Sequence, residues 1–194
     1  MKKLFIIAMA SLMTMTIANA QTIKDDIQAS EKRAAELKKL MDNQPKACGV
    51  AEIDNYATAI NNAAVLAIGN SEKMSNLYYR EIGETKDGVT EVKEQKPTAQ
   101  DWTELGAGIA GEGTLLKKAQ ESAEAAAKKL QAMGEEAKNA GNPMAKAKAA
   151  KQVKAATAVV VYGKDALPIL VNETAAQAKA IKQIIDTVKS GKRL

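Results

Sequence analysis

The sequence contains no histidine, one cysteine and few aromatic residues, which make up 3% of its 194 positions. Without histidine, the chain has no imidazole metal ligand, no histidine acid or base near neutral pH, and no Ser-His or Cys-His nucleophile pair. A single cysteine excludes an internal disulfide framework and a zinc site built from several thiolates. We therefore expect a protein that is not an enzyme and holds no metal or cofactor, although glycosidase chemistry by two carboxylates needs no histidine.

The first twenty residues differ in composition from the rest of the chain. Lys2 and Lys3 precede a largely apolar run, 4–17, and an Ala-Asn-Ala triplet ends at Ala20. This order is typical of a secretory signal peptide, and the run is too short to cross a membrane comfortably. We expect cleavage after Ala20 and export to the periplasm or the medium of a bacterial cell. Loss of the two lysines lowers the net charge from +5 to +3.

Helix-forming residues dominate the chain from residue 21 onwards, while β-branched and aromatic residues are scattered. The most apolar later segment, 155–171, is interrupted by Lys164, Asp165 and Pro168, so no further membrane-crossing stretch is expected. The sequence therefore predicts one soluble all-α domain over 21–194. Its expected architecture is an elongated antiparallel bundle of about four helices with coiled-coil-like heptads.

Turn-forming residues mark the limits of the first two helices. The first helix is expected from Ile23 to about Asn43, because Pro45 cannot continue it. The second begins after the corner at 46–49 and ends near 82–83, where a glycine suits a helix end.

The third and fourth helices have clear start signals. Thr98, with Asp101 three residues later, is a near version of the capping box. Gly141 suits the left-handed position past a helix end, Asn142 suits an N-cap and Pro143 suits a first helical position. These signals predict an antiparallel hairpin of two helices, each roughly 60 Å long if it holds about 40 residues.

The stretch between the second and third helices, 84–97, is rich in charged and turn-forming residues. Asp87-Gly88 suits the type I′ turn of a β-hairpin between the short runs 79–82 and 89–92. A polar loop is the alternative, because two isolated strands are only marginally stable. The sequence leaves a small hairpin near 79–93 and a loop equally open.

The last two helices each carry an inward seam with the 3,4 spacing of heptads. The third seam is Trp102, Leu105, Ile109, Glu112, Leu116, Ala119, Ala123, Ala126, Leu130, Met133 and Ala137. The fourth seam is Ala149, Val153, Ala156, Val160, Gly163, Leu167, Leu170, Thr174, Gln177, Ile181, Ile184 and Val188. Glu112 is the one charged residue in the seam of the third helix. Thr174 and Gln177 are two consecutive polar places in the seam of the fourth helix.

Glu112 lies among four glycines, at 106, 108, 111 and 113, and each costs a helix about 1 kcal/mol relative to alanine. We expect a Gly-flanked irregular turn that exposes Glu112 to water; a functional or register-fixing role in the seam is the alternative. The segment 105–116 is thus a kink, a tight helix crossing or a stretch that contacts lipid. Its G-x-G-x-x-G spacing lacks the preceding strand of a dinucleotide site, so no phosphate site is expected.

Four lysines, Lys146, Lys148, Lys151 and Lys154, form an acid-free start to the fourth helix. Such a patch is either a solvated helix face or an interaction face for acidic protein or anionic lipid. Export and the scarcity of aromatic residues make nucleic acid a poor partner. We single out these lysines as the interaction face.

Three further positions are distinctive. Cys48 is either a small side chain packed under the corner at 46–49 or a thiol that pairs between chains. Pro168 should bend the fourth helix. Asp-Thr-Val at 186–188 resembles a bacterial O-glycosylation sequon, which would place the glycan on Thr187.

These observations favour an exported, non-enzymatic structural or protein-interaction protein of the bacterial cell envelope, in a chaperone-like or scaffold role. Two alternatives stay open. One is a protein that binds membrane surfaces or forms helical pores, for which 105–116 and 155–171 are the candidate apolar stretches. The other is a self-assembling coiled-coil oligomer that uses the same heptads between chains.

Overall fold

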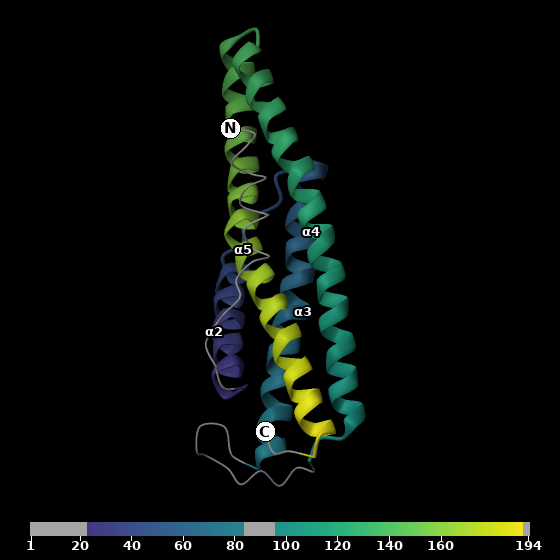
Figure 1. Ribbon diagram of the computed structural model, residues 1–194. Coiled ribbons are helices and arrows are strands. Elements are labelled where there is room, and N and C mark those ends of the chain that lie inside the picture. The colour runs from purple at the N-terminus through teal and green to yellow at the C-terminus, as the bar shows by residue number, and fades with distance from the viewer. Residues whose placement is uncertain (1–22, 84–95, 192–194) are drawn as a thin grey trace.

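The computed structural model describes residues 23–83 and 96–191 of the chain. They form four α-helices: α2 (Ile23–Asp42), α3 (Ala51–Ile82), α4 (Ala99–Asn139) and α5 (Pro143–Lys189). The helices pack against each other as an elongated bundle, with no strand in the described part (Figure 1). The prediction of an all-α bundle of about four helices is confirmed.

The two longest helices, α4 and α5, form the predicted antiparallel hairpin. α3 packs against both of them, and the shorter α2 packs against α3 and α5 (Figure 1). α5 continues as a helix through Pro168, and its axis changes direction in its middle section. The bundle therefore has four helices along part of its length and only the α4–α5 hairpin at one end.

Local capping explains where the long helices begin and end. Thr98 and Asp101 form the complete capping box of α4, and the Asn142 side chain accepts a hydrogen bond from the Ala145 N–H at the start of α5. The left-handed conformation expected for Gly141 is wrong, because the extended residue Ala140 ends α4 instead. The hairpin turn is therefore made by extended backbone and the Asn142 cap.

The corner between α2 and α3 is held by one carboxylate. Asp54 accepts hydrogen bonds from the backbone N–H groups of Cys48 (2.8 Å) and Gly49 (2.9 Å). Gly49 has φ +78°, a conformation that favours glycine. Asp54, in the first turn of α3, thus fixes the path by which α2 returns along the bundle.

The β-hairpin considered near 79–93 is not formed at its first strand. Residues 79–82 belong to α3, which ends at Gly83 in a left-handed conformation. The first strand of the expected hairpin is therefore wrong, because α3 keeps its helical hydrogen bonds up to this glycine cap. Residues 84–95, including Asp87-Gly88 and the run 89–92, lie outside the described residues.

The buried side chains form two apolar clusters along the bundle. The first apolar cluster includes Leu37, Ile53, Tyr56, Ile60, Leu116, Ala119, Ala166 and Leu170. The second apolar cluster includes Ile27, Met74, Leu77, Trp102, Leu105, Ile109, Ile181 and Ile184. The seam positions predicted from the sequence supply most of the α4 and α5 members.

Close helix contact in the first cluster depends on Gly163. A Cβ atom built there would overlap the ring of Tyr56, which is 1% exposed. Burial raises the pKa of the Tyr56 hydroxyl to about 12. Glycine in the α5 seam therefore makes room for a tyrosine ring of the facing helix α3.

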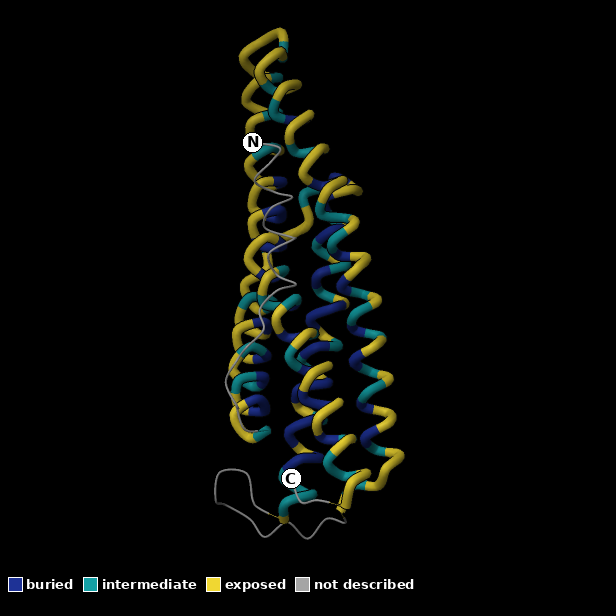
Figure 2. The backbone as a smooth tube through the Cα atoms, in the orientation of Figure 1, coloured by how far each residue is buried: buried dark blue, intermediate teal, exposed yellow. Residues whose placement is uncertain are grey.

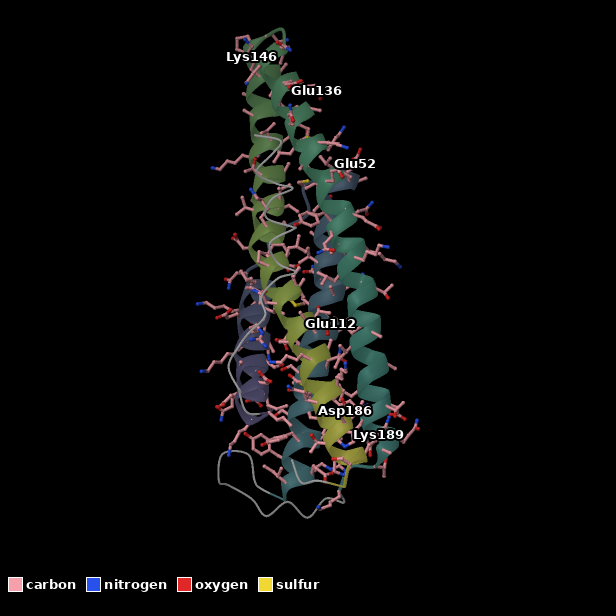
Figure 3. All side chains as sticks on the ribbon, viewed as in Figure 1. Glu52, Glu112, Glu136, Lys146, Asp186 and Lys189 are labelled. Atoms are coloured by element: carbon pink, nitrogen blue, oxygen red, sulfur yellow. The ribbon has the colours of Figure 1, made fainter. Side chains whose placement is uncertain are left out.

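The end of the α4–α5 hairpin differs from the rest of the bundle. We call residues 130–155 the arm and the remaining described residues the body. The arm continues past Glu52, in the first turn of α3, to Glu136 and Lys146 (Figure 3). Met133 is the only buried residue of the arm, and most of its surface is exposed (Figure 2). The arm is a two-helix projection from a four-helix body.

Candidate functional site

Two features of the structure could carry a function: the basic surface of the arm and a layer of buried polar side chains in the body. They lie far apart along the bundle, as the labelled Lys146 and Glu112 show (Figure 3). The arm carries the interaction face expected from the sequence.

All four lysines of that face, Lys146, Lys148, Lys151 and Lys154, are exposed. None forms an ion pair with a carboxylate of the described residues. The arm contains five lysines and two glutamates, and the first acidic residue of α5 is Asp165. The structure therefore places the predicted face on the projecting end of the molecule, with a net charge of +3 on the arm.

The arm also exposes small and apolar side chains between its lysines. Met144, in the first turn of α5, is 84% exposed, the most of any large hydrophobic residue described. Alanines at 132, 147, 150 and 155 are exposed as well. Lysine stems can lie along such a surface while their ammonium groups stay in water, so the arm combines charge with contact area.

The second feature lies between the two apolar clusters, where every helix contributes polar side chains at one level. This polar layer consists of Ser30 and Arg33 from α2, Asn70 and Ser71 from α3, Glu112 from α4, and Glu173, Thr174 and Gln177 from α5. Glu112, Glu173 and Gln177 are 0% exposed. Burying a carboxylate costs stability unless it is paired or hydrogen-bonded, so the effect of the layer on stability depends on the contacts of each carboxyl group.

Glu173 is the hub of the layer. Its carboxylate accepts hydrogen bonds from Ser30, from Arg33 Nε at 2.5 Å and from Gln177 Nε2 at 2.6 Å. The Arg33 contact is also an ion pair, with the arginine side chain 24% exposed and the glutamate fully buried. Glu173 therefore joins α2 to α5 through a charged partner at the edge of the bundle.

Glu112 has only neutral partners among the described residues. Asn70 Nδ2 lies 2.8 Å from Oε2, and Thr174 Oγ1 lies 2.6 Å from Oε1. Burial raises the pKa of the Glu112 carboxyl, the hydrogen bonds from Thr174 and Asn70 oppose this rise, and the charge of Glu173 adds to it. The two buried glutamates therefore differ in their partners: Glu173 pairs with Arg33, whereas Glu112 has no cationic partner among the described residues.

Some polar atoms of the layer have no partner among the described residues. Gln177 donates from Nε2 to the Ala67 carbonyl at 3.0 Å and to Glu173, but its Oε1 is buried without a donor. Arg33 Nη2 is likewise buried without an acceptor. A buried layer with incomplete hydrogen bonding stabilises the bundle less than an apolar layer of the same shape would.

The structure corrects the expectation for Glu112. α4 is continuous from Ala99 to Asn139, and Glu112 is fully buried, so the irregular, water-exposed turn is wrong. Gly108 allows Asn70 to approach: a Cβ atom at Gly108 would lie 2.6 Å from Asn70 Oδ1. Residues 105–116 lie within the unbroken helix α4, and their seam residues Leu105, Ile109, Glu112 and Leu116 are buried in the bundle.

The other distinctive positions are separate from both features. Cys48 is half-buried against the first apolar cluster, and its thiol pKa is raised, mainly by burial. Pro168 is exposed on α5. Thr187 is half-buried near the end of α5, where its hydroxyl donates to the Gln183 carbonyl at 2.7 Å. None of the three is brought together with the arm lysines or the polar layer.

The sequence marked Glu112, Thr174 and Gln177 as polar places in the seams, but it did not predict that they meet side chains of α2 and α3 in one layer. Ser30 and Asn70 occupy places in the apolar spacing of α2 and α3 where a hydrophobic residue is missing, between Ile27 and Ala34 and between Ala67 and Met74. Those gaps were the available signal. Their alignment with Glu112 depends on how the helices are shifted along one another.

No helix in the described ranges combines the length and the apolarity that a membrane crossing requires. The same residues contain no group of three or more Cys, Asp or Glu side chains placed to hold a metal ion. Comparison of the chain with protein families, curated proteins and solved structures found no match.

Proposed function

We propose that this protein is an exported, non-enzymatic helical protein of the bacterial envelope whose arm binds an acidic surface of a partner protein. One observation carries the proposal: four exposed lysines without a described carboxylate partner lie on the projecting end of the bundle. Lysines paired within the fold would be partly neutralised. Unpaired lysines on a projection keep their charge available to another molecule.

The physical basis of such binding is long-range attraction followed by close contact. At physiological ionic strength, charges interact over about 8 Å, so several lysines on one short helical segment act together on an approaching acidic surface. Complementary charge chiefly raises the association rate and selects the partner. The exposed Met144 and the neighbouring alanines supply apolar contact once the partner is in place.

The proposal is tested first by mapping contacts in the living envelope. A photo-crosslinking amino acid is placed at Met144, on the arm, or at Val65, which is 60% exposed on the body. We expect a discrete crosslinked protein from the Met144 position and none from the Val65 position. Equal crosslinking from both positions would contradict a binding role for the arm.

The second step tests the charge. The variant Lys146→Glu, Lys148→Glu, Lys151→Glu, Lys154→Glu reverses the interaction face. Its matched control reverses four exposed lysines of the body, Lys38, Lys39, Lys179 and Lys182. Only the arm variant should lose the crosslink from Met144, and added salt should weaken the wild-type crosslink.

Other outcomes select the alternatives. Tight binding to phosphatidylglycerol vesicles at physiological salt, lost in the arm variant, would favour a membrane-surface protein. A crosslinked product made of two copies of this chain would favour the self-assembling coiled coil. If the crosslink from Met144 were unchanged after charge reversal, the four arm lysines would not contribute to partner binding.

A further inference from the structure

The one charged side chain that acts on the pKa of Glu112 is Glu173, and its effect is to raise that pKa. From α3 the facing group is Asn70, and from α5 the facing groups are Thr174 and Glu173. α2 contributes Arg33, but its Nε pairs with Glu173. No cation among the described residues pairs with Glu112, so an ionised Glu112 would be a buried charge held by two neutral groups.

The proton count at Thr174 points to the same conclusion. Its hydroxyl lies 2.8 Å from the Leu170 carbonyl, which can only accept, and 2.6 Å from Glu112 Oε1. A hydroxyl has one proton to donate. If Thr174 gives it to the carbonyl one turn earlier, the Glu112 contact needs a proton on the glutamate. A neutral Glu112 satisfies both contacts at once, whereas an ionised one competes with the carbonyl.

The helix that carries Glu112 is weak at this point. The four glycines at 106, 108, 111 and 113 each cost about 1 kcal/mol of helix propensity relative to alanine. Packing therefore holds this part of α4 in place more than the helix itself does. A change that loosens the packing at Glu112 therefore acts on a segment of low helix propensity.

We propose that Glu112 is a pH-sensitive latch, which holds α4 against α3 and α5 when its carboxyl is protonated and releases the segment 105–116 when the proton passes to solvent. Opening lets water reach the buried carboxylate. It also exposes part of the second apolar cluster, beginning with Leu105 and Ile109 and the neighbouring Trp102, all of which are at most 4% exposed in the closed bundle.

The direction of the switch follows from burial. Because the pKa of Glu112 is raised in the folded bundle, its contribution to stability is complete below the pKa of the unfolded chain and is lost as the pH rises through the folded value. The bundle is therefore closed in acid and opens at a pH above the usual titration range of a glutamate.

Trp102 makes the latch measurable, because it is the one tryptophan of the chain and is 2% exposed in α4. Acrylamide quenching of its fluorescence is followed from about pH 4 to about pH 9, a range that spans raised glutamate pKa values. The wild-type chain should show at least about a twofold rise in the quenching constant with pH, as expected for local opening. Glu112→Gln should keep the low value throughout, and the exposed Glu121→Gln should behave as wild type.

A second measurement needs no variant, so it holds even if Glu112→Gln fails to fold. Amide hydrogen exchange is measured in the wild-type chain over the same pH range and corrected for the intrinsic effect of pH. As the pH rises, the protection of amides in 105–116 should fall at least about tenfold, while the protection of amides in 159–170 should stay unchanged. Wild-type quenching that is flat across the range would overturn the proposal. So would an identical pH response in a folded Glu112→Gln variant, or equal loss of protection in both segments.

Discussion

The body and the arm are continuous along α4 and α5, yet they bury very different side chains. In the body, four helices enclose tryptophan, tyrosine, isoleucine and leucine side chains in two apolar clusters. In the arm, Met133 is the one buried residue, and with the half-buried Leu130 and Val153 it forms the end of the first apolar cluster, while the other inward side chains are half-buried alanines. Apolar burial provides most of the stability of a fold, so the body is expected to hold the molecule together and the arm to contribute little.

The body and the arm also differ in where their titratable side chains lie. The body buries the carboxyl groups of Glu112 and Glu173 within a polar layer, whereas the arm exposes its lysines to solvent. Buried carboxyl groups act on the stability and pH response of the protein itself. Exposed and unpaired charge acts on other molecules. Each region can therefore be changed with little effect on the other.

The largest contrast is expected from one leucine truncated in each region. Leu170→Ala removes a fully buried side chain of the body and should lower the free energy of unfolding by about 2–5 kcal/mol. Leu130→Ala removes a half-buried side chain of the arm, and about 1 kcal/mol is expected. Urea denaturation followed by circular dichroism measures both. Equal losses would show that the arm is as tightly packed as the body.

A smaller contrast separates two ion pairs. Arg33→Ala leaves Glu173 buried without its charged partner, and about 2 kcal/mol of stability should be lost, less than for a fully buried pair because Arg33 is 24% exposed. The exposed pair of Lys128 with Glu124, at 2.7 Å, is the matched control. Lys128→Ala should leave the urea midpoint unchanged. An unchanged midpoint for Arg33→Ala as well would mean that the polar layer tolerates an unpaired carboxylate.

The two regions also differ in what a helix cap contributes to stability. Thr98→Ala removes the cap of α4 in the body, and a global loss of about 1 kcal/mol is expected. Asn142→Ala removes the same kind of cap at the tip of the arm. Its effect should be confined to faster amide exchange in the first turns of α5, with the global unfolding midpoint kept. A global loss from Asn142→Ala would show that the tip is part of the cooperative core.

The smallest effect is expected from the interaction face itself. Replacing Lys146, Lys148, Lys151 and Lys154 with glutamine should change the free energy of unfolding by no more than about 0.5 kcal/mol, since all four are exposed and unpaired with described carboxylates. The same urea experiment checks it. A large loss of stability would mean that these lysines support the fold.

Much of the fold was predictable because its signals are local. Pro45, Gly83, the capping box at Thr98 and the Asn142-Pro143 start each act within one helical turn, and the limits predicted from them agree with the structure to within one or two residues. The strand expected at 79–82 was wrong because short apolar and aromatic runs suit strands and helices alike. The glycine at 83 was the better guide.

The polar layer was not predictable from local signals. Glu112 was noticed as the break in one seam, but its burial depends on Asn70 and Thr174, which come from two other helices. Four glycines around it favoured an irregular turn by propensity, and tertiary packing overrode that preference. The arm lysines were found from sequence alone, whereas their place on a projection required the lengths of α2 and α3 relative to the hairpin.

Native-state hydrogen exchange along the wild-type chain tests the division into body and arm most directly. We expect amides in 159–170 of the body to exchange only through global unfolding. Amides in 135–152 of the arm should exchange through local opening, with protection at least about tenfold lower. Uniform protection from 135 to 170 would contradict the account, because the two regions would then unfold as one cooperative unit.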